Sequence, residues 1–164
     1  MKKKELTSTV YEYPSRQELT SQQSQLIDEA RKAASTAYAP YSNFFVGAAV
    51  RLENQQIVHA SNQENSAFPS GLCAERTAVF YANARYPQTP VIALAIAANN
   101  GEEPIKKPFP PCGACLQVLL ESERRYQTPI EIILFGSEKI IVAENVEQFL
   151  PHGFTEVNLR DSDQ

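Results

Sequence analysis

Two short stretches decide how this chain folds: residues 73–82 read CAERTAVFYA, and residues 111–120 read PCGACLQVLL. Each places cysteine before residues that favour helix. Cys73 opens one predicted helix, and the pair Cys112 and Cys115 opens another. The unpaired N–H groups and the positive end of the dipole at a helix start stabilise a thiolate. Two such helices that point at one place would hold three thiolates together.

Outward from these helices, short apolar runs alternate with helical patterns. The expected strands cover 45–52, 56–61, 91–98, 130–135 and 139–143. The first expected helix follows a cap at Thr20 or Ser21 and has an apolar face from Leu26 to Ala37. The second begins at Cys73, the third covers 116–126, and a last turn covers 146–150. The order α-β-β-α-β-α-β-β predicts a layered α/β domain whose sheet is covered by helices.

Length and composition indicate one domain. The chain has 164 residues, a net charge of -4 and 43% hydrophobic residues, which is typical of a globular protein. Residues 1–20 are polar and lack periodicity, so we expect an N-terminal arm there and a single domain over 21–164. No apolar stretch suits a signal peptide or a membrane span, which predicts a cytoplasmic protein with no membrane partner. The acidic balance argues against nucleic acid as a partner.

The cysteines indicate a metal site. There are three of them in a chain without an export signal, so a disulfide framework is not expected. Thiolates are zinc ligands, and the spacing of Cys112 and Cys115 lets both converge on one ion. A structural zinc site has four protein ligands, but no fourth cysteine exists, and His59 and His152 lie in neither motif. Three ligands and a water are the arrangement of a catalytic zinc site.

Glu75 stands two residues after Cys73, in the first turn of the same predicted helix. A lone glutamate there usually interacts favourably with the helix dipole and does nothing more. Beside an open metal position it can take a proton from the metal's water and deliver it to a substrate. Cys-x-Glu followed by Pro-Cys-x-x-Cys is the pattern of zinc deaminases in their three-cysteine version. We therefore predict Zn²⁺ as the cofactor and Glu75 as the catalytic proton shuttle.

The chain resembles the small cytidine deaminases that act on free nucleosides, the homotetrameric type with three cysteine ligands. The similarity runs from about Ala39 to Phe154. Its landmarks follow in order: APYSNF at 39–44, VGAA at 46–49, NQEN at 62–65, CAERTA at 73–78 and PCGAC at 111–115. The resemblance implies a three-layer αβα fold with a mixed five-stranded sheet, and a homotetramer. It also implies hydrolysis of cytidine, and of deoxycytidine, to the uracil nucleoside and ammonia in pyrimidine salvage.

The resemblance assigns substrate contacts as well. Asn62 and Glu64 would hydrogen-bond the ribose hydroxyls, and Phe44 would pack near the base. The backbone around Ala74 would contact the base. Phe154 matches a C-terminal aromatic that in the family reaches a neighbouring subunit's active site, and packing on its own domain is the alternative.

Arg76 would donate to the zinc thiolates. Three thiolates on Zn²⁺ leave a net charge of about -1, and a nearby guanidinium restores some positive character. The alternative is an exposed helix residue. Two positions depart from the family: Leu116 stands where arginine is frequent, and Phe68 stands where tyrosine is common.

Three other interpretations stay open. A deaminase of the same superfamily could act on an aminopyrimidine antibiotic, a free base or a deoxynucleotide, although Asn62-x-Glu64 favours a ribose-bearing nucleoside. A structural zinc module predicts a fourth protein ligand and no turnover. A dithiol redox protein would use Cys112 and Cys115, but it would leave Cys73 unexplained.

Overall fold

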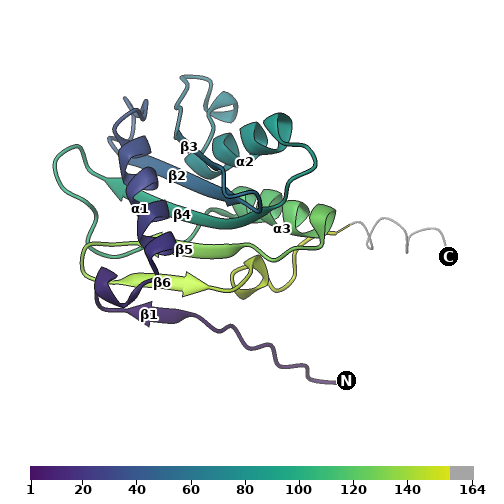
Figure 1. Ribbon diagram of the computed structural model, residues 1–164. Helices are drawn as coiled ribbons and strands as arrows, with labels where there is room; N and C mark the ends of the chain where they lie inside the picture. The colour runs from purple at the N-terminus through teal and green to yellow at the C-terminus, as the bar shows by residue number, and fades with distance from the viewer. Residues whose placement is uncertain (156–164) are drawn as a thin grey trace.

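The computed structural model of the chain describes residues 1–155, so the stretch 156–164 of the predicted domain lies outside the described residues (Figure 1). The strands are β1 (Tyr11–Tyr13), β2 (Phe45–Leu52), β3 (Ile57–Ser61), β4 (Val91–Asn99), β5 (Glu131–Phe135) and β6 (Ile140–Ala143). The helices are α1 (Ser21–Ala34), α2 (Ala74–Arg85) and α3 (Gly113–Tyr126), with 3₁₀ turns η1 (Arg16–Glu18), η2 (Phe68–Ser70) and η3 (Val146–Gln148). Among residues 1–155, no helix has the length and apolar character that a bilayer crossing requires.

The strands form one mixed sheet in the order β1-β6-β5-β4-β2-β3. The β4–β5 pair is parallel, and the other neighbouring pairs are antiparallel. Alternate residues of β2 serve the two faces: Ala49 packs with Leu26 and Ala30 of α1, whereas Val50 packs with Ala78 of α2. α1 therefore covers one face, and α2 and α3 cover the other (Figure 1). The predicted three-layer αβα fold is confirmed.

The sheet has six strands, where five were expected. The additional strand is β1, from the N-terminal arm, and it pairs antiparallel with β6. Tyr11 Oη donates to the Glu144 carboxylate at 3.0 Å, and Lys139 Nζ donates to the Glu12 carboxylate at 2.6 Å. A strand of three residues at the sheet edge is too short to show an alternating apolar pattern, so periodicity could not find it.

α1 and α2 start where the sequence predicts them, whereas α3 begins at Gly113 and not at the expected 116. The Thr20 hydroxyl accepts the N–H of Gln23, and the Gln23 side chain accepts the N–H of Thr20, which is a capping box at the start of α1. Cys73 and Cys112 hold the N-cap positions of α2 and α3, and neither side chain makes a capping hydrogen bond. Both sulfurs can therefore face a common point.

α1 ends earlier than its apolar pattern suggests, at Ala34. The hydroxyls of Ser35 and Thr36 donate to the carbonyls of Lys32 and Ala33, at 2.8 and 2.9 Å. Such local bonds compete with the next helical turn, so Ala37 lies beyond the helix.

The contact between α1 and the sheet depends on a glycine. A Cβ atom on Gly47 of β2 would lie only 1.9 Å from the carbonyl oxygen of Ala30. Because any larger residue would collide with the backbone of α1, glycine is what allows helix and strand to approach so closely.

Candidate metal centre and active site

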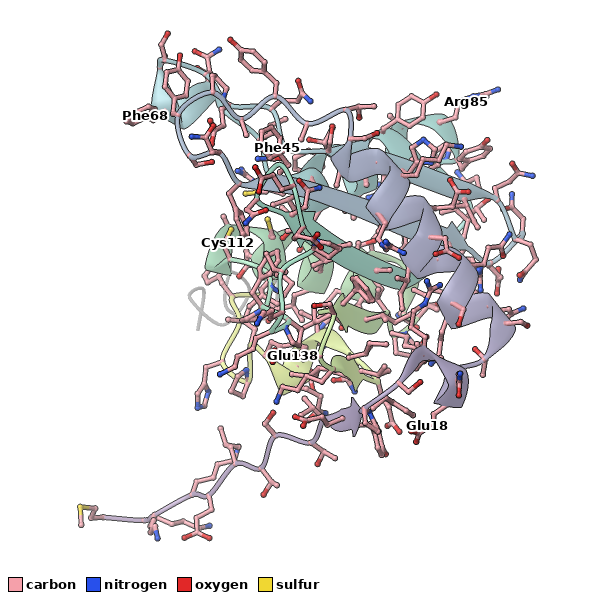
Figure 2. All side chains as sticks on the ribbon, turned by 90° about the vertical axis from the view of Figure 1, so that its left-hand side faces the viewer. Glu18, Phe45, Phe68, Arg85, Cys112 and Glu138 are labelled. Atoms are coloured by element: carbon pink, nitrogen blue, oxygen red, sulfur yellow. The ribbon has the colours of Figure 1, made fainter. Side chains whose placement is uncertain are left out.

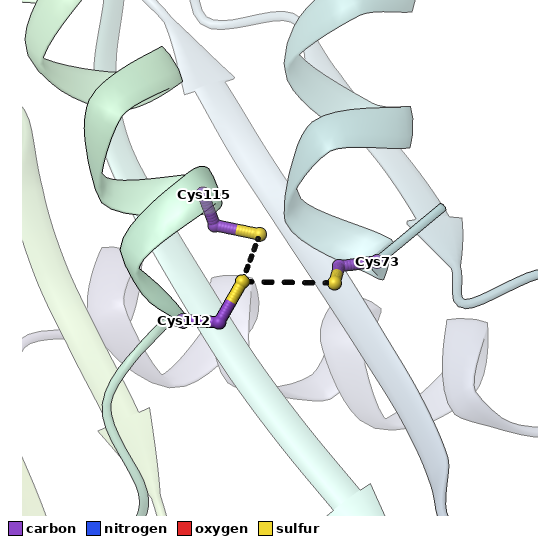
Figure 3. A group of neighbouring side chains, drawn as sticks. All are labelled: Cys73, Cys112 and Cys115. Carbon is purple, nitrogen blue, oxygen red and sulfur yellow. Dashed lines mark hydrogen bonds between the residues drawn. The ribbon is translucent and has the colours of Figure 1, made fainter. Parts of the chain in front are cut away.

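The three cysteines meet where α2 and α3 begin (Figure 3). Cys112 Sγ lies 3.9 Å from Cys73 Sγ and 3.4 Å from Cys115 Sγ. All three sulfurs lie within 4.8 Å of one another. A tetrahedral ion with Zn–S bonds of about 2.3 Å would hold its sulfurs about 3.8 Å apart. Both the donor type and the spacing therefore fit zinc.

Within the described residues 1–155, this is the one group of at least three histidine, cysteine or acidic side chains close enough to hold a metal ion. His59, on β3, instead places Nδ1 3.0 Å from Glu29 Oε2. His152 is exposed beyond η3. The described part of the chain thus brings together three thiols and adds no fourth ligand of these types, which leaves a tetrahedral ion one position for water.

The pKa values of Cys73 and Cys115 are shifted in opposite directions. Hydrogen bonding with Cys115 is the main cause that lowers the pKa of Cys73 to about 5, with burial opposing it and Arg76 adding to it. The same contact with Cys73, together with burial, raises the pKa of Cys115. Arg76 Nη2 lies 3.8 Å from Cys73 Sγ, which is the neighbourhood that the sequence suggested. A guanidinium so placed favours the deprotonated thiol that a metal requires.

Glu75 lies in the first turn of α2 and is only 4% exposed. Burial is the main cause that raises the pKa of its carboxyl group, and the nearby charge of Cys73 raises the pKa further. A higher pKa makes the carboxylate a stronger base and brings its proton exchange nearer to neutral pH. A buried carboxyl group beside a metal centre can therefore receive and return a proton.

A cavity of about 460 Å³ opens beside the cysteine cluster. The residues that line it include Cys73 and Arg76 from the start of α2, together with Tyr41, Asn62 and Glu64. Its volume lies within the usual range for small-molecule sites. Two of the predicted substrate residues therefore share a cavity with a predicted metal ligand.

Glu64 holds the 41–42 turn in place. Its carboxylate accepts the backbone N–H groups of Tyr41 and Ser42, at 2.9 and 3.3 Å. Hydrogen bonds from Ser42 and Tyr41 lower the pKa of the Glu64 carboxyl group. An ionised carboxylate has about four acceptor sites, so Glu64 keeps capacity for a ligand hydroxyl.

Asn62 anchors the start of β2. Its Oδ1 accepts the N–H of Val46 at 2.8 Å, and its Nδ2 donates to the carbonyl of Phe44 at 2.9 Å. A carboxamide has two N–H donors, so one remains for a ligand. The Phe44 ring packs edge-to-face on Phe109 with centroids 5.3 Å apart. Ala74 is fully buried at the start of α2.

Phe154 is placed apart from this cavity, whose lining residues do not include it. The residue is 57% exposed, and its backbone is hydrogen-bonded to the side chain of Gln117 on α3. Gln117 is a residue that sequence reasoning missed, because no local pattern connects positions 117 and 154.

The surroundings explain the departure at Leu116, whereas the one at Phe68 has no structural explanation. Leu116 is 6% exposed and belongs to the core between the sheet and its helices, where an apolar side chain suits the environment. Phe68 begins the 3₁₀ turn η2, in a part of the chain that projects from the molecule (Figure 2), and its ring packs edge-to-face on Tyr41 with centroids 5.8 Å apart. Sequence reasoning also missed Tyr41 as a cavity residue, although Tyr41 belongs to the APYSNF landmark.

Comparison with known proteins relates the chain to deaminases. A family profile described as the cytidine and deoxycytidylate deaminase zinc-binding region matches residues 20–128. Cytidine deaminase from Halalkalibacterium halodurans is 36% identical, aligned over 83% of this chain and 96% of that protein. Cytidine deaminase from Sporosarcina psychrophila is 38% identical, over 82% of this chain and 92% of that protein.

Solved structures agree with these relatives. The crystal structure of cytidine deaminase from Burkholderia pseudomallei matches with a TM-score of 0.70 and 34% identity, covering 83% of this chain and 100% of that one. The crystal structure of cytidine deaminase from Mycobacterium tuberculosis matches with a TM-score of 0.64 and 30% identity, covering 80% of this chain and 96% of that one.

Proposed function

Since the chain belongs to the cytidine and deoxycytidylate deaminase family, we propose that it hydrolyses cytidine to uridine and ammonia. One observation carries this proposal: three thiols converge at two helix starts, with a buried carboxyl group in the first turn of one helix and a nucleoside-sized cavity alongside. The chain is thus a zinc-dependent hydrolase of a C–N bond. Deoxycytidine, which carries the same base, is a second substrate.

Cys73, Cys112 and Cys115 would hold the zinc ion. When bound, zinc would lower the pKa of a water molecule towards neutrality and so supply the nucleophile for C4 of cytosine. The carboxylate of Glu75 accepts a proton from the attacking water and delivers it to N3 of the base. Glu75 then carries the remaining hydroxyl proton to the amino group, which leaves as ammonia. The water's oxygen becomes the carbonyl oxygen of uridine.

The cavity residues orient the nucleoside. Asn62 and Glu64 bind the ribose hydroxyls, which is supported by the spare N–H of the carboxamide and the spare acceptor sites of the carboxylate. Phe44 packs near the base, and the backbone around Ala74 contacts it. Arg76 moderates the negative charge of the thiolates, which its distance of 3.8 Å from Cys73 Sγ supports.

The chain works as a homotetramer in which Phe154 reaches a neighbouring subunit's site. This is supported by the exposure of Phe154 and by two exposed aromatic residues of α2, Phe80 at 48% and Tyr81 at 59%.

The deaminase domain spans 21–164, and residues 1–20 form an arm. The enzyme serves pyrimidine salvage in the cytoplasm, where cysteine ligands stay reduced. Its net charge of -4 disfavours nucleic acid as a partner.

The decisive experiment incubates purified, zinc-loaded protein with cytidine and measures uridine and ammonia. We expect stoichiometric release of both products and equal amounts of zinc and protein chain. A panel with cytosine, deoxycytidylate and an aminopyrimidine antibiotic separates the rival deaminase activities, because a ribose-binding cavity should favour the nucleosides. If the protein consumes none of these compounds, or exchanges disulfides without bound metal, the proposed function is wrong.

A further inference from the structure

In the C-terminal segment 149–154, the backbone of Phe154 is hydrogen-bonded to one side chain of α3. Gln117 Nε2 donates to the carbonyl oxygen of Phe154 at 2.7 Å, and Gln117 Oε1 accepts the N–H of Phe154 at 3.2 Å. One carboxamide therefore binds both backbone polar groups of the same residue. Because these two groups flank the Cα atom of Phe154, the pair of bonds restricts the direction in which the phenyl ring leaves the chain.

The neighbouring residue reinforces this contact. A Cβ atom on Gly153 would lie 2.1 Å from Leu120 Cδ2, so glycine is what lets the segment lie close against α3. Gln117 and Leu120 are three residues apart on the helix and therefore share a face. The segment is thus held against the same side of α3 by a polar contact with Gln117 and an apolar contact with Leu120.

Gln117 lies on α3, the helix that also carries the metal-ligand candidate Cys115. Gln117 follows the metal-ligand candidate Cys115 by two residues, and side chains two apart on a helix do not share a face. Cys115 is fully buried, whereas Gln117 is half-buried and binds the backbone of the exposed residue Phe154. Gln117 does not line the 460 Å³ cavity, and the hydrogen bonds of its side chain join it to Phe154. We therefore expect it to influence the reaction through Phe154.

We propose that Gln117 is a positioning residue, whose carboxamide fixes the backbone of Phe154 so that the phenyl ring is already oriented for the substrate. The inference rests on the proposed function, in which Phe154 contacts the nucleoside in the assembled enzyme. A ring that is held in place before binding does not lose its freedom when the substrate arrives, and this improves affinity. The chemical step takes place elsewhere, so turnover at saturation is unaffected.

Kinetics test the role of Gln117. Gln117→Ala removes both bonds, and Gln117→Glu keeps an acceptor for the Phe154 N–H but sets an oxygen against the Phe154 carbonyl. Both variants should raise KM for cytidine about three- to tenfold with kcat within about twofold of wild type, as expected for loss of neutral hydrogen bonds. The matched control Glu121→Ala changes an exposed residue one turn further along α3 and should leave both constants unchanged.

A double-mutant cycle shows whether Gln117 acts through Phe154. The double variant Gln117→Ala/Phe154→Ala should have the same KM as Phe154→Ala alone, because the first change has nothing left to position. Zinc content should match wild type in every variant. If the two KM increases multiply, or if Gln117→Ala lowers kcat without changing KM, the proposed role is overturned.

Fluorescence gives a readout that does not depend on catalysis. The chain has no tryptophan, so Phe154→Trp introduces one per chain at the segment itself, and excitation at the long-wavelength edge of tryptophan absorption avoids the seven tyrosines. Adding Gln117→Ala should lower the anisotropy of that tryptophan and increase its quenching by acrylamide, while Glu121→Ala should change neither. Unchanged anisotropy in an active enzyme would overturn the role of Gln117 alone. A wild-type protein that leaves cytidine unchanged would instead overturn the proposed function.

Discussion

Replacing Glu75 by glutamine separates proton transfer from every other role of that residue. Glutamine has the same shape as glutamate, but it cannot carry a proton between water and the base. A positioned general acid–base group contributes about 10²–10⁴ in rate, so kcat should fall by that factor. This corresponds to about 2.7–5.4 kcal/mol of lost transition-state stabilisation. KM should change little, because Glu75 stays in place and the cavity residues are untouched.

Stability provides the internal control for Glu75→Gln. The side chain is 4% exposed, and burial disfavours its charged form, so a neutral amide of equal size should leave the thermal midpoint unchanged or higher. Zinc content should remain equal to wild type, because the metal ligands are the three sulfurs. The assay measures uridine formation, bound zinc and thermal unfolding on the same preparation, with Glu121→Gln as the surface control. Turnover within about threefold of wild type, with zinc and fold intact, would refute the proton-shuttle role.

Other perturbations address the metal, the packing and the termini. Cys112→Ala should lose zinc and activity together, and metal analysis of the purified variant checks this. Gly47→Ala should lower the free energy of unfolding by about 1–3 kcal/mol. The reason is that the new Cβ atom would lie 1.9 Å from a backbone oxygen of α1. Gly113→Ala is the control in the same denaturation experiment, because no atom lies close to the position of its Cβ. Deleting residues 1–13 should expose the edge of β6, lower the thermal midpoint and promote concentration-dependent association, measurable by light scattering. Burial raises the pKa of the Glu123 carboxyl group in the folded state, so its contribution to stability is greatest below the ordinary carboxyl pKa and is lost as pH rises through the raised value. Glu123→Gln keeps an oxygen acceptor and should flatten that part of the stability–pH curve, whereas an unchanged curve would contradict the assignment.

The larger elements could be predicted because their signals are local. β2 coincides with the expected strand 45–52, and β4 extends the expected 91–98 by one residue. The cysteine cluster could also be anticipated, since helix starts favour thiolates and the Cys112–Cys115 spacing lets two sulfurs converge. Each of these signals lies within one helix or strand, whereas the approach of Cys73 to Cys112, 39 positions away, depends on the tertiary structure.

What the sequence did not predict depends on pairs of residues that are far apart in the chain. β1 consists of three residues whose strand character comes from β6, at the other end of the chain. Gln117 and Phe154 are 37 residues apart, and neither position has a distinctive pattern. Asn62 was expected only as a ligand contact, but it also anchors the start of β2 through Val46. Such contacts appear only when tertiary structure brings the partners together.

Because the helix starts at the metal centre lack side-chain caps, we expect the supply of metal to affect the amount of folded protein. Serine, threonine, aspartate and asparagine are the residues that normally cap the N-terminus of a helix, as Thr20 does for α1. Cys73 and Cys112 make no such bond, and their sulfurs, 39 positions apart in the chain, meet at one site. An ion held there would fasten both helix ends at once. In a cell with little zinc, the first turns of α2 and α3 would then unfold more often. Proteases would degrade such chains, so little intact apoenzyme would remain to bind zinc later.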